Sequence, residues 1–266
     1  VAYIDGVSQT NLQTGTTSTT INHSAIDQVQ IIVGGFEAEY GRVMSGIVNV
    51  VTKEGGRTYS GTAEYITDKP TGRNWLKTPS FGYHNLDLSL GGPLLPNTSR
   101  VSLFSSGEIR NLEDARPRWG VQVLPAEKAI LTPTAFAKLS EGLLPHHGLN
   151  GWTFQNKLTF KWTPRLTLRT GALFSTNDRE SYLHSYRYDL DHAPRVADQN
   201  LSTFANLTYL IGPKTFVTYA VNTFHNQFKS GDGTHFDSLA DYGRPRGNPG
   251  FDREWLFYSW DQDSTA

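Results

Sequence analysis

Strict two-residue alternation between residues 152 and 163 is the feature that most constrains the fold of this chain. The even-numbered positions are apolar apart from Asn156 and carry a tryptophan at each end, whereas every odd-numbered position is polar. Because successive side chains of a β-strand point to opposite faces, one face of this strand is apolar and aromatic and the other is polar. Aromatic rings at both ends of an apolar band are typical of a strand that crosses a membrane, since amphipathic rings lie at the headgroup level.

Six other segments alternate more weakly, so we expect a mainly β protein with seven antiparallel strands. The other six are Tyr59–Thr67, Phe81–Leu90, Arg100–Arg110, Leu166–Asn177, Asn200–Ile211 and Thr215–Lys229. The connections alternate between long (68–80, 111–151, 178–199 and 230–266) and short (91–99, 163–165 and 212–214). Outer-membrane β-barrels join their strands by short periplasmic turns and long extracellular loops. A β-sandwich follows no such rule, so the alternation favours a transmembrane barrel.

Composition excludes several classes of protein. The 24 basic and 25 acidic residues give a net charge of −1, without the basic excess typical of nucleic-acid-binding proteins. The mean hydropathy of −0.43 resembles that of a soluble protein, but lipid-facing and lumen-facing residues of a barrel also average to a polar value. No apolar run approaches the roughly 20 residues of a membrane helix. The absence of cysteine excludes disulfides and thiolate metal sites.

Residues 1–56 differ from the remainder of the chain in their sequence pattern. The segment Ile26–Val33 is predicted to begin as a short turn or helix and continue as a strand, and Ile47–Lys53 is a strand rich in β-branched residues. Glycine pairs end both segments. We therefore predict a small α/β unit with short buried strands over residues 1–56, followed by barrel strands with long loops over residues 57–266.

Two stretches of this first unit carry a resemblance to a known family. Residues 26–42, which end in the run Glu37-Ala38-Glu39-Tyr40-Gly41-Arg42, together with residues 46–56, closely resemble the end of the plug domain in TonB-dependent outer-membrane receptors. Tyr3–Val7 resembles the preceding plug strand. Leu88–Leu94 resembles the first periplasmic turn of the subgroup that often carries a carboxypeptidase-regulatory-like N-terminal domain. The sequence departs from the family at Val33-Gly34, where many members have Arg-Gly.

The resemblance implies a plug that occludes a barrel of about 22 strands in the bacterial outer membrane. It also implies ligand capture by extracellular loops and import driven by the TonB complex, which would act on a segment upstream of Val1. Seven strands cannot close such a barrel without leaving unsatisfied backbone groups in lipid. The chain also opens within what reads as a folded element and ends in a polar run over 261–266, without a closing strand. We therefore expect it to be part of a longer protein.

The plug resemblance supplies the first set of candidate site residues. The plug motif comprises Gly34, Gly35, Glu37, Glu39, Tyr40, Gly41 and Arg42, in which the glycines are expected to provide backbone freedom for tight turns. The register of the expected strands points Glu64 and Glu108 into the lumen, where either could pair with Arg42 and hold the plug. The alternative is that these charges are solvated in a wet lumen and contribute little.

The long loops supply the second set, which is rich in aromatic residues suited to stacking on a sugar or gripping a peptide. Its members are Trp75, Trp119, Tyr182, Tyr186, Arg187, Tyr188 and Trp255. The alternative is an aromatic girdle that continues past the membrane edge.

Catalytic and metal motifs have little support. The chain lacks a Gly-x-Ser-x-Gly elbow, a His-Glu-x-x-His motif and a P-loop, so we expect neither an enzyme nor a cofactor. Asp232, Asp237 and Asp241 are loosely spaced and lack the EF-hand pattern, and the adjacent His146-His147 pair is poorly suited to chelating one ion. We therefore predict no metal site.

Three functions remain open from the sequence. The first is TonB-dependent uptake of an oligosaccharide, a peptide or a metal chelate, with outer-membrane lipid, the TonB complex and an unknown extracellular ligand as partners. The second is an outer-membrane barrel that serves as a structural or assembly partner in a larger envelope complex. The third is a secreted glycan-binding β-sandwich. A TonB box upstream would separate the first from the second, and detergent-dependent solubility would separate both from the third.

Overall fold

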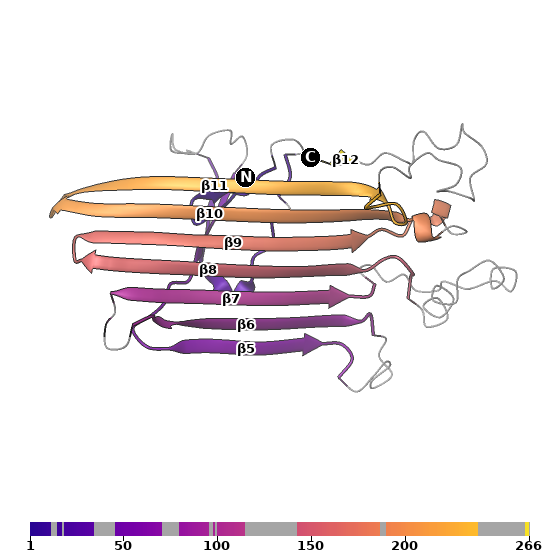
Figure 1. The fold of residues 1–266 in the computed structure, drawn as a ribbon, viewed down its shortest axis with the longest axis horizontal. Coiled ribbons are helices and arrows are strands. Elements are labelled where there is room, and N and C mark those ends of the chain that lie inside the picture. The colour runs from indigo at the N-terminus through magenta and orange to yellow at the C-terminus, as the bar shows by residue number, and fades with distance from the viewer. Residues whose placement is uncertain are drawn as a thin grey trace, which may run out of the picture.

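The computed structural model describes residues 1–11, 15–17, 19–34, 46–70, 80–95, 98, 100–114, 143–186, 190–238 and 264–265. These residues form two β-sheets, a four-stranded one near the N-terminus and an eight-stranded one that follows it. We call them the plug sheet and the wall sheet. In Figure 1 the plug sheet lies behind the wall sheet, whose strands run horizontally. Among the described residues, no helix is long and apolar enough to cross a membrane.

The plug sheet has the strand order β2-β1-β4-β3, with β1 parallel to β4 and the other pairs antiparallel. Asp5 and Gly6 join β1 to β2 with φ angles of 48° and 84°, the positive values that a two-residue type I′ turn requires and that Asp-Gly readily adopts. A 3-10 turn, η1 (His23–Ala25), precedes β3 and is capped by Asn22. The strands are β1 (Ala2–Ile4), β2 (Val7–Ser8), β3 (Ile26–Ile32) and β4 (Ile47–Thr52). The described part of this unit contains no α-helix.

The wall sheet confirms the seven predicted strands, each hydrogen-bonded antiparallel to the next along the chain. They are β5 (Ser60–Thr67), β6 (Tyr83–Pro93), β7 (Val101–Leu112), β8 (Leu149–Thr163), β9 (Leu166–Glu180), β10 (Pro194–Gly212) and β11 (Thr215–Asp232). The short turns lie at one end of the sheet and the strand ends that carry the long connections lie at the other, which is on the right in Figure 1. The predicted boundary between residues 56 and 57 falls in the connection from β4 to β5 and stays a prediction.

Two expectations about strand ends were wrong. The strands extend further into the long-connection end than predicted, since β9 continues to Glu180 and β10 begins at Pro194, where Arg195 pairs with Glu180. The polar run at the C-terminus also contains a short strand, β12 (Ser264–Thr265), which pairs with Ser230 and Lys229 of β11. Backbone hydrogen bonds drive both extensions, and the apolar alternation used for prediction carries no signal for them.

The two faces of the wall sheet have opposite chemistry. On β8 the odd-numbered polar residues from Thr153 to Thr159 are buried, with Lys157 only 3% exposed, whereas Trp152 and Phe154 are 49% and 46% exposed. Cross-strand pairing extends this division, because Phe154 pairs with Gly107, which in turn pairs with the 48%-exposed Leu88. We call the face of Lys157 the inner face and the face of Phe154 the outer face. The plug sheet packs on the inner face, where Ile4 and Val50 share a small core with Leu173 of β9.

Candidate functional site: the plug–wall interface

The centre of the interface is a buried ion pair between Lys157 and Asp5. The Lys157 ammonium lies 3.0 Å from Asp5 Oδ1, and the two side chains are 3% and 6% exposed. Lys157 Nζ also donates to the carbonyl oxygen of Thr52 at 2.9 Å, and Asp5 accepts from the Thr52 backbone N–H at 3.1 Å and from its hydroxyl. Because both charges have several hydrogen-bonding partners, their desolvation is compensated, as a buried ion pair requires. The pair joins the β1–β2 turn of the plug to the middle of β8.

Glu54 extends this contact toward the neighbouring strand. Its carboxylate lies 2.6 Å from Nε of Arg169 on β9, accepts from the Thr159 hydroxyl at 3.3 Å, and lies 3.9 Å from Lys157 Nζ. Arg169 and Glu54 are 38% and 34% exposed, so this second pair is half-solvated and contributes less than the buried one. Ion pairs between carboxylates of the plug and cations of the wall therefore stabilise this side of the interface.

A second cluster joins η1 to β5 and β6. The Ser24 hydroxyl donates to Oδ1 of Asp87, a residue only 1% exposed, at 2.7 Å. The imidazole of His23 lies 3.4 Å from Asp87 Oδ2 and 3.4 Å from Glu64 Oε2. These contacts are ion pairs only while the imidazole is protonated. The contact between His23 and Asp87 Oδ2 is not a hydrogen bond, and Oδ2 has no hydrogen-bond partner in this structure.

Neutral contacts continue across the inner face as far as β11. Gln9 Nε2 donates to the hydroxyl of Ser202 at 3.1 Å, and the hydroxyls of Thr20 and Thr153 lie 2.9 Å apart. Asn222 donates to the Gly6 carbonyl oxygen at 3.3 Å. Together with the contacts of Asp87 on β6 and Arg169 on β9, these bonds join the plug to β6 and to β8, β9, β10 and β11 through polar side chains that the alternation places inward.

At Gly55 the backbones of plug and wall approach closely. A Cβ added there would lie 2.4 Å from the carbonyl oxygen of Leu103 and 2.7 Å from its nitrogen. We expect Gly55→Ala to lower the free energy of unfolding of the plug by about 1–3 kcal/mol, because backbone must move to admit the methyl group. Urea unfolding of the purified protein measures the loss. Gly56→Ala is the matched control, since its nearest neighbour lies at an ordinary 3.4 Å. Equal effects at the two glycines would contradict the close approach.

The structure places the predicted plug and ion-pair residues as follows. Gly34 follows β3 with φ of +81°. Glu64 and Glu108 both pair with Asp87 in the strand register and lie on the inner face, and the plug contact of Glu64 is His23. Gly35, Glu37, Glu39, Tyr40, Gly41 and Arg42 lie outside the described residues, so the pairing of Arg42 with either glutamate stays a prediction.

Sequence reasoning missed the residues that anchor the plug most firmly: Asp5, Glu54, Lys157 and Arg169. One signal was available, because Lys157 stands at the middle of the polar face of β8 and a lysine there must meet an acid or water. No comparable sequence signal identified Asp5 as the partner of Lys157. Asp5 was assigned only to a resembling plug strand, although Asp-Gly before Val7 is typical of a hairpin turn.

The predicted ligand-facing residues lie partly within the described chain. Tyr182 and Tyr186 are half-buried in the connection between β9 and β10, at the end of the wall that carries the long connections. Trp75, Trp119, Arg187, Tyr188 and Trp255 lie outside the described residues. Ligand contact by this set stays a prediction.

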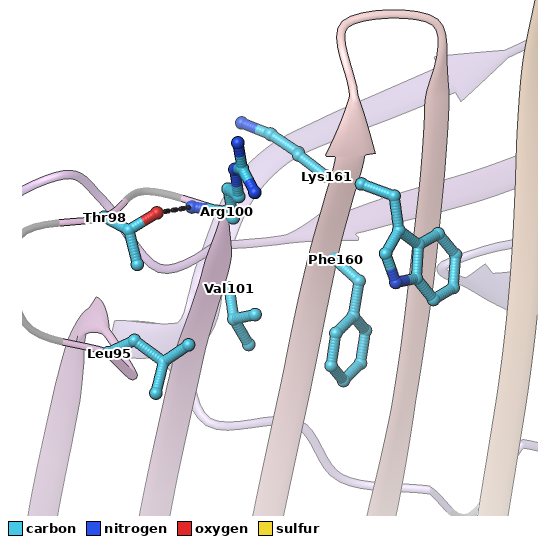
Figure 2. Close-up of a pocket in the computed structure, with 7 residues that line it drawn as sticks. Leu95, Thr98, Arg100, Val101, Phe160 and Lys161 are labelled. Carbon is cyan, nitrogen blue, oxygen red and sulfur yellow. Dashed lines mark hydrogen bonds between the residues drawn. The ribbon is translucent and has the colours of Figure 1, made fainter.

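A hollow of about 510 Å³ lies at the opposite end of the wall, beside the short turns. Figure 2 shows Val101 and Phe160, which pair across β7 and β8, below the cationic side chains of Arg100 and Lys161. Leu95, Thr98 and Trp162 complete the lining, and the Thr98 hydroxyl accepts from the Arg100 backbone N–H at 3.2 Å. Cations and aromatic rings above an apolar band match the headgroup level of a membrane.

Comparison with known proteins supports this architecture through structure alone. No family model and no curated protein matches the sequence. The chain aligns over 87% of its length with 28% of FpvA of P. aeruginosa, solved with an iron–pyoverdine complex, at a TM-score of 0.58 and 12% identity. The ferric enterobactin receptor PfeA of Pseudomonas aeruginosa is similar at a TM-score of 0.47 and 14% identity, and the alignment covers 87% of this chain and 38% of that one. The siderophore receptor PirA of the same organism is similar at a TM-score of 0.44 and 14% identity, and the alignment covers 89% of this chain and 41% of that one.

Of the three, only FpvA aligns with a TM-score above 0.5. The chain spans between about a quarter and two fifths of the length of these proteins, all of which are TonB-dependent siderophore receptors. In fold, the chain is therefore similar to a segment of FpvA, and it consists of a four-stranded plug sheet followed by consecutive antiparallel strands of the wall sheet.

Proposed function

We propose that the protein is an outer-membrane receptor that imports an extracellular ligand in a TonB-dependent manner. The observation that carries this proposal is the inverted wall sheet, whose apolar face is exposed while its polar face is buried against a plug. A sheet of this kind is stable where its outer face meets hydrocarbon and its inner face meets an occupied, polar lumen. The bacterial outer membrane is the location that this arrangement supports.

The orientation follows from the connections. Short turns join β8 to β9 and β10 to β11, and such turns face the periplasm in outer-membrane barrels. The long connections would then face the cell exterior and capture the ligand, with Tyr182 and Tyr186 among the residues near it. The plug, bonded to the inner face, would block the passage until energy from TonB displaces or rearranges it.

The alternative functions are less well supported. A β-sandwich buries an apolar face against a second sheet, whereas the plug sheet contacts the polar face of the wall through hydrogen bonds and ion pairs. An assembly role without transport would not require a plug fastened at several points by reversible polar contacts. The neighbouring structures are receptors and not enzymes, which supports a non-catalytic function.

Uptake by cells that express the full-length protein tests the proposal. Labelled ferric siderophores, oligosaccharides and peptides are offered separately to cells that lack their own receptor for each, with and without a functional TonB complex. The metal chelate is the class supported by FpvA, which was solved with iron pyoverdine. The proposal expects accumulation of one class that disappears without TonB. Accumulation of none of the three, or uptake that is indifferent to TonB, would contradict it.

A further inference from the structure

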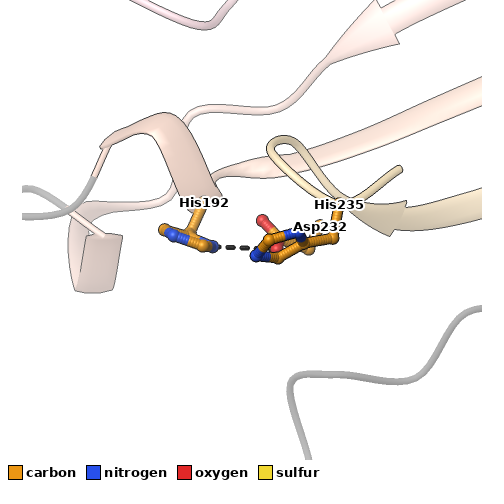
Figure 3. A group of neighbouring side chains, drawn as sticks. All are labelled: His192, Asp232 and His235. Carbon is orange, nitrogen blue, oxygen red and sulfur yellow. Dashed lines mark hydrogen bonds and ion pairs between the residues drawn. The ribbon is translucent and has the colours of Figure 1, made fainter. Parts of the chain in front are cut away.

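Two histidines and an aspartate meet at the long-connection end of the wall, where sequence reasoning expected no metal site. His192 ends the 3-10 turn η5 (Leu190–His192), Asp232 is the last residue of β11, and His235 lies in the turn that follows. Figure 3 shows the three side chains turned toward one another from two separate segments of chain. One potential ligand atom from each lies within 4.8 Å of the other two. His192 Nδ1 lies 2.8 Å from Asp232 Oδ2, and the two imidazole centroids are 5.6 Å apart.

Tight backbone packing holds these segments together. A Cβ added at Gly233 would lie 2.6 Å from the carbonyl oxygen of Asp191 and 2.9 Å from that of Ala193. The Thr234 hydroxyl donates to the same Asp191 oxygen at 2.8 Å, and the Thr234 backbone N–H donates to Asp232 Oδ1 at 3.2 Å. The cluster is thus pre-formed by contacts that do not involve the two imidazoles.

The cluster is also shielded from solvent. Asp232 is 5% exposed and His235 is 9% exposed, while the side chain of His192 is 14% exposed. Ala193 and Phe236, at 2% and 4%, pack beside it. Positive charge at the oxygens stabilises a carboxylate enclosed in this way beside two imidazoles, and a bound cation would supply such charge.

Among the described residues, two basic side chains that lie over the ring of Phe236 are paired with other carboxylates. Lys229 lies 2.8 Å from Asp237, whose pKa is lowered chiefly by the hydrogen bond from that lysine, and Arg195 forms a two-pronged pair with Asp178. Both cations also lie over the ring of Phe236, at 4.2 and 4.6 Å from its centroid. Their pairing reduces the repulsion that a metal ion would otherwise meet.

We propose that His192, Asp232 and His235 bind one divalent transition-metal ion, with Zn²⁺ as the best fit and a fourth position left for water or an outside ligand. Two imidazoles and one carboxylate are the donors of borderline metals, whereas Ca²⁺ and Mg²⁺ prefer oxygen-only sites. Tetrahedral Zn²⁺ with bonds of about 2.0–2.1 Å places its ligand atoms about 3.4 Å apart. The ligand atoms now lie within 4.8 Å of one another, and changes in side-chain torsion bring them to this spacing. The bound ion would tie the β9–β10 connection to the end of β11.

The proposal does not depend on uptake, so binding is measured on the full-length protein purified in detergent and stripped of metal. Isothermal titration with Zn²⁺, and the visible absorption of Co²⁺ as a tetrahedral probe, count the sites. We expect His192→Ala and His235→Ala to remove one Zn²⁺ equivalent. The affinity should fall by more than the roughly 10–100-fold typical of losing an outer-shell partner. Excess Ca²⁺ should not compete.

His225→Ala is the matched control, because His225 is an exposed histidine on β11 that lies outside the cluster. Asp232→Asn provides a second test that does not depend on the alanine variants folding, since the amide keeps the size of the carboxylate but loses its charge. It should weaken Zn²⁺ binding while His225→Ala leaves it unchanged. Equal Zn²⁺ stoichiometry and affinity in the original protein and in Asp232→Asn would overturn the proposal.

Discussion

Replacing Lys157 by methionine is expected to loosen the plug more than any other single change on the inner face. The substitution leaves the Asp5 carboxylate, whose side chain is 6% exposed, without its cation in the same enclosed position. Removing one partner of a buried ion pair typically costs about 3–5 kcal/mol, because the remaining charge is uncompensated. A cysteine at Val50, in the plug core and 9% exposed, would report opening of the plug by its labelling rate in increasing urea. The free energy of plug opening should fall by that amount.

Two further variants separate this explanation from a general weakening of β8. Lys161→Met, on the same strand and the same side of it but exposed, should change the opening free energy by less than about 1 kcal/mol. Asp5→Asn combined with Lys157→Met should recover most of the loss, since the buried charge is then gone and asparagine tolerates the positive φ of position 5. Equal losses in Lys157→Met and Lys161→Met would show that the ion pair does not anchor the plug.

A charge placed on the outer face is expected to impair insertion into a membrane. Leu88 lies at the middle of β6, is 48% exposed, and is aligned with Ala63 on one side and Gly107 on the other. Leu88→Arg places a guanidinium in the hydrocarbon, which costs about 2–4 kcal/mol near the bilayer midplane. Refolding of the full-length protein into lipid vesicles from urea measures this loss as a shift of the folding midpoint.

Thr62→Arg is the matched control for the outer face. Thr62 lies at nearly the same height on the neighbouring strand β5, next to Ala63 in sequence and exposed on the inner face. An arginine there meets a polar interior, so the folding midpoint should shift by less than about 1 kcal/mol. A larger loss at Thr62 than at Leu88 would mean that the two faces have been assigned the wrong way round.

The wall strands could be predicted from sequence because their information is local. The period of two along Trp152–Thr163 indicates which residues share a face of the strand. Turns that contain glycine and proline indicate where each hairpin reverses direction. Both signals fade at the long-connection end, where lipid no longer selects apolar residues. Strand β10 therefore begins at Pro194, six residues before the alternation suggested a strand at Asn200.

The plug–wall contacts could not be predicted because they join residues far apart in the chain. Asp5 meets Lys157 from 152 positions away, and Glu54 meets Arg169 from 115 positions away. A single sequence identifies Lys157 as an inward-facing cation but contains no signal for its partner. The sequence predicted a cation on the plug and a carboxylate on the wall. In the Lys157–Asp5 pair the cation is on the wall and the carboxylate is on the plug. His192 and His235 went unnoticed for the same reason, since their meeting depends on the register of β10 and β11.

Between residues 152 and 160 of β8, the even-numbered side chains should face hydrocarbon and the odd-numbered ones should face the plug. The chain contains no cysteine, so nitroxide labels can be attached to single cysteines at each position from 152 to 160. Collision rates with oxygen and with a polar nickel chelate are then measured in the full-length protein in lipid vesicles. We predict high oxygen accessibility at every even position, with labels at the odd positions immobilised and protected from both reagents. Even positions that are as immobile and protected as the odd ones would contradict the account, because the apolar face would then be packed against protein.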